Sequence, residues 1–156
     1  MKLQTKWLVL APITLLLALA SCNTAPTYSD YTHKPMNINV EGNSETLDKV
    51  QDLFNSKDYE TANTHLSRVA EYYVKYAEVQ LYYGITFLEL EQYPLAKVTF
   101  DKILRYKDSG FVDDAQWYLA LMALKQNDTE TCKTYLEQIP EDSNYYDKAS
   151  DLLQKL

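Results

Sequence analysis

The stretch AEVQLYYGITFLELEQYPLAKVTFDKIL, residues 77–104, decides the fold class of this 156-residue chain. Its first half has almost no polar face, which predicts a helix that is covered on both sides. Pro94 suits the first turn of a second helix, because proline lacks only an N–H that would be unpaired there. Small residues at Gly84 and Ala96 would let the two helices approach closely, with Phe100 filling the space between them. The stretch therefore predicts a closely packed helix pair.

The same pattern recurs before and after this stretch. At a spacing of 34 residues it aligns with the segment that precedes it, and at a spacing of 36 residues with the segment that follows. A turn at residues 107–110 accounts for the two additional residues. The aligned positions are Tyr59 with Tyr93, Ala62 with Ala96, Leu66 with Phe100, Gly84 with Ala120, Ala96 with Cys132, and Phe100 with Leu136.

These aligned positions resemble the tetratricopeptide (TPR) repeat, a helix pair of about 34 residues. The resemblance covers residues 44 to about 140. It implies an all-α, right-handed superhelical stack of antiparallel helix pairs, about three pairs plus a C-terminal capping helix that opens at Ser143. The chain departs from the family pattern at Thr46, Gln80 and Gln116, where a large aromatic residue is expected. A generic stack of helical hairpins is the alternative, and it has the same fold class.

Two of the expected helices, around residues 79–90 and 115–124, are apolar all round and must be covered on both sides. One side packs on the second helix of its pair, and the resemblance places the other along a concave groove. Two interpretations stay open for that groove: it holds a partner's helix or extended segment, or it is filled internally by the last helix or by residues 36–40. The expected groove residues are Phe54, Leu81, Ile85, Leu88, Trp117, Leu121 and Leu124.

The N-terminus carries the pattern of a secretory signal. Two lysines precede a run of fourteen mostly apolar residues, which is too short to span a bilayer but typical of a signal peptide. The run ends in Leu19-Ala20-Ser21-Cys22, which resembles the lipobox of bacterial lipoproteins. The resemblance implies that Cys22 is lipidated and becomes the first residue of the mature chain. An ordinary secretory signal or an uncleaved anchor is the alternative.

The sequence thus predicts three parts: a lipoprotein signal peptide at residues 1–21, a lipidated Cys22 with a flexible tether over residues 22–43, and a helical repeat domain at residues 44–156. A flexible tether of this length would reach roughly 25 Å. The alternative is that Ile38 and Val40 add a short ordered segment to the domain. Asn23 follows the cysteine where many inner-membrane lipoproteins have aspartate, and by resemblance this favours the outer membrane of a bacterial cell envelope.

The net charge and the absence of known motifs argue against several classes of function. Loss of residues 1–21 removes two of 15 basic residues and none of 22 acidic ones, which leaves a net charge of −9. Such an acidic body would repel nucleic acid and anionic lipid headgroups, so we expect the membrane to be reached through the lipid. His33 and His65 have no metal-ligand spacing, and Cys132 occupies a small-residue packing position. No nucleotide-binding or nucleophile motif appears.

The sequence therefore predicts no enzyme, no cofactor, no metal and no small-molecule substrate. The predicted function is a membrane-anchored adaptor or scaffold that binds one or more protein partners in the cell envelope. A structural subunit of a permanent envelope complex or homodimer, with its groove filled internally, is the alternative.

Overall fold

Seven α-helices follow one another in the residues that the computed structural model describes, which are 25–31, 33–38, 44–72, 76–106 and 110–156. One 3-10 turn, η1 (Tyr28–Asp30), precedes them, and these residues contain no strand. The prediction of an all-α fold is confirmed. The helices are α1 (Ser44–Asn55), α2 (Tyr59–Tyr72), α3 (Ala77–Glu89), α4 (Tyr93–Arg105), α5 (Val112–Lys125), α6 (Thr129–Leu136) and α7 (Tyr146–Lys155).

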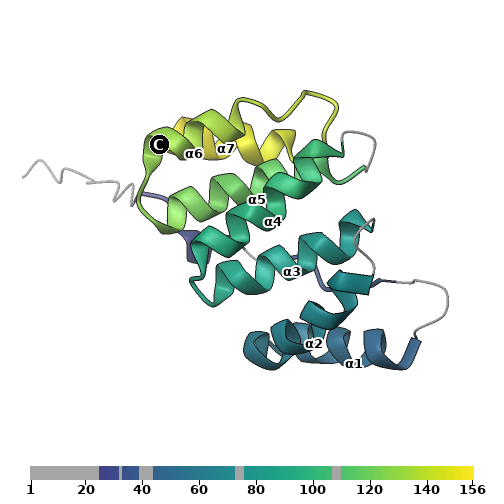
Figure 1. Ribbon diagram of the computed structural model, residues 1–156. Helices are drawn as coiled ribbons and strands as arrows, with labels where there is room; N and C mark the ends of the chain where they lie inside the picture. The colour runs from purple at the N-terminus through teal and green to yellow at the C-terminus, as the bar shows by residue number, and fades with distance from the viewer. Residues whose placement is uncertain (1–24, 32, 39–43, 73–75, 107–109) are drawn as a thin grey trace, which may run out of the picture.

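The helices form three successive pairs, α1–α2, α3–α4 and α5–α6, with α7 packed against α6 (Figure 1). Neighbouring pairs are joined by contacts of α2 with α3 and of α4 with α5, so each helix packs mainly on the helices next to it in the chain. This is a TPR-like stack with a C-terminal capping helix. The capping helix begins at Tyr146, three residues later than the sequence predicts, because Tyr145 turns inward and is buried while Tyr146 is exposed.

The turn inside each helix pair has the same backbone geometry in all three pairs. One residue adopts a left-handed conformation, with φ of 67° at Lys57, 58° at Glu91 and 59° at Asn127. The amide of the next residue donates to the carbonyl five residues before it, which pairs a carbonyl that the helix end leaves open. These three turns lie 34 and 36 residues apart, so they confirm the predicted repeat register. The bonds run from Asp58 to Leu53 (2.9 Å), Gln92 to Phe87 (2.8 Å) and Asp128 to Ala123 (2.9 Å).

The second helix of each pair begins at a start signal that its sequence supplies, a side-chain cap in the outer two pairs and a proline in the middle one. Asp58 and Asp128 accept hydrogen bonds from the amides of Thr61 and Thr131, at 3.2 and 3.1 Å. These bonds satisfy amides that have no partner inside the helix. In the middle pair Pro94 takes the first turn of α4, as predicted. Local sequence therefore sets where each second helix begins.

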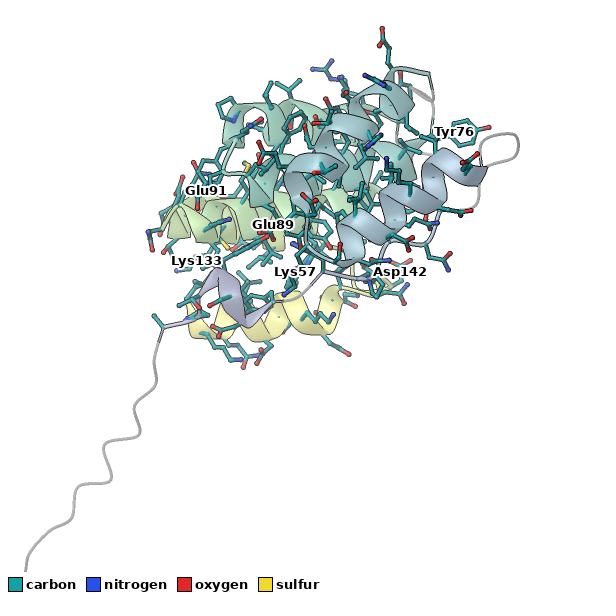
Figure 2. The ribbon with its side chains drawn as sticks, turned by 90° about the horizontal axis from the view of Figure 1, so that it is seen from below. Lys57, Tyr76, Glu89, Glu91, Lys133 and Asp142 are labelled. Carbon is teal, nitrogen blue, oxygen red and sulfur yellow. The ribbon has the colours of Figure 1, made fainter. Side chains whose placement is uncertain are left out.

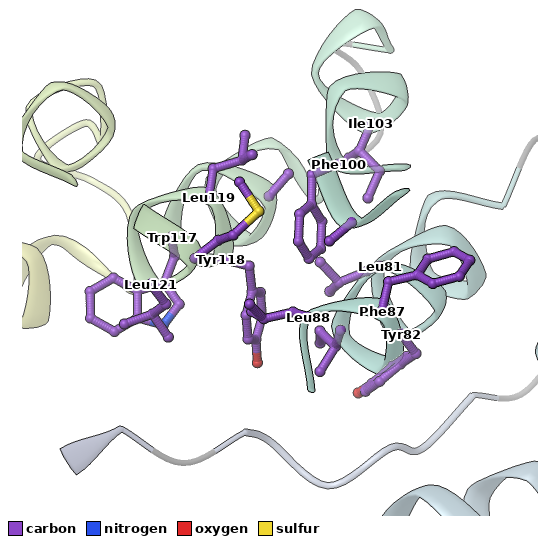
Figure 3. Close-up of a cluster of buried hydrophobic side chains, with 14 of the residues drawn as sticks. Leu81, Tyr82, Phe87, Leu88, Phe100, Ile103, Trp117, Tyr118, Leu119 and Leu121 are labelled. Atoms are coloured by element: carbon purple, nitrogen blue, oxygen red, sulfur yellow. The ribbon is translucent and has the colours of Figure 1, made fainter. Parts of the chain in front are cut away.

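Close approach of the helices depends on the small residues that the sequence predicts to be buried. Gly84, Ala96, Ala120 and Cys132 are all buried, and Phe100 lies between α3 and α4 with no exposed surface. The two helices with apolar residues all round are α3 and α5, each of which has nine buried residues. The core therefore runs along the stack through these two helices (Figure 3).

The N-terminal part differs from the flexible tether predicted over residues 22–43. Residues 25–31 and 33–38, which we call the N-terminal segment, lie against the helix stack, and Met36 and Ile38 are buried. The tether interpretation missed this because the segment has no helical period and binds through contacts distant in sequence. Its alternative, an ordered segment including Ile38 and Val40, agrees with the structure at Ile38. Val40, Cys22 and residues 1–21, the predicted signal peptide, lie outside the described residues.

Candidate interaction groove

The residues predicted to line the concave groove lie on α1, α3 and α5, and all of them are buried. None of the seven has more than 8% of its surface exposed. Figure 3 shows the N-terminal segment running as an extended chain past the ends of the side chains on α3 and α5. The groove is therefore filled internally in this structure. The filling includes Met36 and Ile38, within the predicted residues 36–40, and extends further N-terminal to Tyr28, Tyr31 and His33.

Three polar side chains hold the main chain of the N-terminal segment. Asn55 binds Met36 twice: its Oδ1 accepts from the Met36 amide at 2.8 Å, and its Nδ2 donates to the Met36 carbonyl at 3.1 Å. Gln51 accepts from the Ile38 amide at 2.6 Å. The Tyr82 hydroxyl donates to the Pro35 carbonyl at 3.1 Å. These bonds hold an extended backbone and do not depend on which side chains it carries.

Burial keeps the Tyr82 hydroxyl in its donor form. Loss of solvent around the ring, together with the negative charge of Glu78, raises the pKa of Tyr82 to about 12. The hydroxyl is therefore neutral at physiological pH and has a proton to donate. Figure 3 shows the hydroxyl oxygens of Tyr82 and Tyr118 on the side of their helices that faces the segment.

Side chains of the segment fill the apolar part of the groove. Met36 and Ile38 have only 2% and 4% of their surface exposed. Tyr31 meets the ring of Trp117 edge to face, with ring centroids 5.5 Å apart. Such aromatic pairs add about 0.5–1.5 kcal/mol to the free energy gained by burial. The segment thus contributes to the core of the domain.

A polar cluster holds the upstream part of the segment at the C-terminal end of α3. The Glu89 carboxylate contacts Nε2 of His33 and accepts from the Tyr28 hydroxyl at 2.6 Å. Lys125 lies 3.9 Å from the same carboxylate and 4.8 Å from the centroid of the Tyr28 ring. Burial acts to raise the pKa of Glu89, but the hydrogen bonds from His33 and Tyr28 and the nearby charges hold that pKa below its usual value. The Glu89 carboxylate is therefore charged, and it accepts hydrogen bonds from side chains of the segment.

A second carboxylate of the groove, that of Asp114, lies at the start of α5. Asp114 accepts from the Tyr145 hydroxyl at 2.6 Å and has the Lys34 ammonium at 3.8 Å. That ammonium also lies 4.6 Å from the centroid of the Tyr145 ring. Burial and the negative charge of the nearby Asp114 raise the pKa of Glu78. This end of the groove therefore favours a cation.

An open cavity of about 480 Å³ remains beside the segment. It lies between the α1–α2 turn, the end of α3 and the end of α5, and the residues at its wall include Lys57, Tyr59 and Glu89. Figure 2 labels Lys57 and Glu89 on this side of the molecule. The cavity is continuous with the polar cluster, so its wall combines aromatic rings with charged groups of both signs.

The titratable side chains outside the groove bear on metal binding. The part of the chain that the structure describes holds no group of three or more His, Cys, Asp or Glu side chains placed to bind a metal ion. Cys132 is buried, as its packing position predicts, and burial followed by the Asp128 charge raises its thiol pKa to about 11. Among the helices of the described residues, none is long and apolar enough to cross a membrane.

Sequence reasoning offered residues 36–40 as one possible filling of the groove, but it missed the more N-terminal residues that also fill it. Tyr28, Tyr31 and His33 were placed in a tether, and their partners on α3 and α5 had no predicted polar role. One signal was available, because Met36 and Ile38 alternate with polar residues as in a half-buried extended chain. No sequence signal predicted the contact of His33 with Glu89, because 56 residues separate the two in the chain.

One comparison with known proteins bears on the fold. Residues 114–142 match the profile of the tetratricopeptide repeat family. The helix pairs are TPR-like. The matched residues include most of α5, all of α6 and the residues after it up to Asp142. They contain the α5–α6 turn at Asn127, which repeats the geometry of the other two pairs. No curated protein and no solved structure matches the chain.

Proposed function

We propose that this protein is a non-catalytic adaptor, anchored by a lipid in a bacterial cell envelope, that binds a protein partner. One observation carries the binding part of the proposal. The concave face holds an extended polypeptide through Asn55, Gln51 and Tyr82, which bind main-chain groups, while apolar side chains are buried alongside. A groove with these properties is suited to bind a protein segment.

The anchoring part rests on Leu19-Ala20-Ser21-Cys22 and on the apolar run before it. Two or three acyl chains would hold the protein stably in a membrane, and Asn23 favours the outer one. Only Asn23 and Thr24 separate Cys22 from the first described residue of the segment. Since each residue spans at most about 3.6 Å, a docked segment keeps the domain within roughly 10 Å of its lipid. The adaptor would then work close to the bilayer surface.

A labelling experiment tests the anchor. Cells that express the protein are fed a clickable palmitate analogue, and the wild type is compared with Cys22→Ser. We expect label only in the wild-type protein. That protein should sediment with the membranes, and its mass should be that of a chain lacking residues 1–21. An unlabelled wild-type protein of full precursor length would refute the anchor.

A crosslinking experiment tests the adaptor function. The lipidated protein is crosslinked in its own membrane, and the crosslinked peptides are identified by mass spectrometry. We expect one recurrent protein partner that is lost with Cys22→Ser, because the soluble variant no longer shares the membrane. The adaptor proposal fails if no crosslink to another protein recurs between preparations.

A second candidate function is a structural subunit of a permanent complex or homodimer. The filled groove favours it, because Trp117, Leu121 and the rest of the predicted groove residues are already covered by the chain itself. Light scattering on purified Cys22→Ser protein distinguishes the two. A monomer supports the adaptor, and a stable dimer supports the structural subunit.

A further inference from the structure

The N-terminal segment is bound to the groove in the way one protein binds a peptide of another. Its residues 33–38 are extended, and it is joined to α1 only through residues 39–43. The groove binds its backbone at three residues, Pro35, Met36 and Ile38. These bonds would be available to any extended chain that took its place.

We propose that residues 28–31 and 33–38 of the N-terminal segment are a ligand carried by the protein itself, and that the groove binds in their place an extended partner segment of the same chemistry. This deepens the proposed adaptor function and rests on it. The partner segment has two apolar side chains at alternate positions, as at Met36 and Ile38. An aromatic side chain and an imidazole or a cation precede them, as at Tyr31, His33 and Lys34.

The side chains that a partner segment needs follow from the residues that line each part of the groove. Met36 and Ile38 are buried where only apolar groups avoid a desolvation cost. Tyr31 packs edge to face on Trp117 at a 5.5 Å centroid distance. An aromatic group is favoured there because its positive edge meets the negative face of a ring.

The charge preference follows from two carboxylates. Glu89 takes hydrogen bonds from Tyr28 and His33, and Asp114 has Lys34 at 3.8 Å. An acidic partner segment would place like charges against both carboxylates in a chain whose net charge is already −7. The groove therefore favours a neutral or basic segment.

A covalently joined ligand competes strongly with a free one. A short connection gives the N-terminal segment an effective concentration on the order of millimolar. The apparent dissociation constant for a free segment is then its intrinsic value divided by the fraction of molecules whose groove is open. A free ligand should bind the wild type weakly and should bind much more tightly once the built-in segment is weakened.

The test uses the full chain with Cys22→Ser and a fluorescent peptide that copies residues 25–38. Its binding is measured by anisotropy to this protein and to a variant that also carries Met36→Ser and Ile38→Ser. We expect the variant to bind the peptide at least tenfold more tightly. Adding Asn55→Ala to the variant should weaken binding about tenfold, since two main-chain groups of the peptide lose their partner. A peptide with serine at both apolar positions is the control and should not compete.

Equal affinity of the two proteins for the peptide, or no binding by a variant that keeps its helical circular dichroism, would overturn the proposal. If the serine variant unfolds, a protease site placed within residues 39–43 replaces it. After cleavage the segment is no longer joined to α1, and labelled peptide should exchange into the groove within hours; a cleaved segment that never exchanges overturns the proposal. If this proposal fails, the adaptor function is still tested separately by the crosslinking experiment. A recurrent partner found there would then contact a surface other than the groove.

Discussion

The ring of Phe100 lies directly against the main chain of Gly84. A Cβ atom built at Gly84 would stand 2.5 Å from Cε1 of Phe100 and 2.8 Å from its Cδ1. Phe100 has no exposed surface, so its ring has no free space into which to move. The contact fixes how closely α3 and α4 approach, because even one methyl group would force them apart.

Gly84→Ala should therefore destabilise the protein although alanine favours helices. The helix preference would contribute about 1 kcal/mol of stability. Overpacking against a buried ring costs about 1–3 kcal/mol. Because the added Cβ would stand only 2.5 Å from a buried ring, we place the cost in the upper half of that range. We therefore expect a net loss of roughly 1–2 kcal/mol in the free energy of unfolding, measured by urea denaturation. The double variant with Phe100→Leu, which makes room for the methyl group, should lose less than the sum of the two single changes. Superimposable curves for Gly84→Ala and wild type would show that α3 and α4 do not approach closely here.

Cys132 should be unreactive in the folded protein. Its thiol is buried and its pKa is raised to about 11, so almost none of the nucleophilic thiolate is present near pH 8. In the Cys22→Ser protein, we expect a thiol reagent to label Cys132 only as fast as the domain opens, and at once in denaturant. Immediate labelling of the native protein would contradict a buried thiol at this packing position.

Glu89 should make stability depend on pH in the acid range. Its pKa in the folded protein lies below the ordinary value of 4.5. Its charged form therefore stabilises the fold fully above about pH 4.5, and that stabilisation is lost as the pH falls through the lowered value. We expect the free energy of unfolding to fall less steeply between pH 5 and about pH 2 in Glu89→Gln than in wild type. Glu91→Gln is the matched control, since this neighbouring side chain is 67% exposed and should leave the slope unchanged.

The helix pairs could be predicted because the information for them is local. Each pair has small residues at fixed spacing, and the turn between its helices follows the same rule at Lys57, Glu91 and Asn127. Helix ends were predicted well where a proline or a cap marks them, as at Pro94. The start of α7 was predicted too early because Tyr145, not the preceding Ser143, packs into the core.

The position of the N-terminal segment could not be predicted in the same way. It is held by contacts such as Tyr28 with Glu89 and Met36 with Asn55, which join residues 61 and 19 positions apart. Such contacts leave no period in the sequence. The predicted groove residues are buried, but the pattern that marks a groove is the same whether a partner or the chain itself fills it.

The state of the groove can be decided at Trp117. This side chain is 3% exposed, with Tyr31 of the N-terminal segment at 5.5 Å on one side and Tyr145 stacked at 5.5 Å on another. Because the chain itself buries the indole, Trp117→Ala should cost about 3–5 kcal/mol in the free energy of unfolding, without any partner present. Leu95→Ala, on a side chain that is 50% exposed, is the control and should change stability by less than about 0.5 kcal/mol.

A double-mutant cycle with Tyr31→Ala then isolates the part of that loss that depends on the segment. We expect a coupling energy of about 0.5–1.5 kcal/mol between Trp117 and Tyr31, the usual range for a packed aromatic pair. A coupling near zero, together with a loss of less than about 1 kcal/mol for Trp117→Ala, would mean that Trp117 is exposed in solution. The groove would then be open in the free protein, and the segment would not have to be displaced before a partner binds.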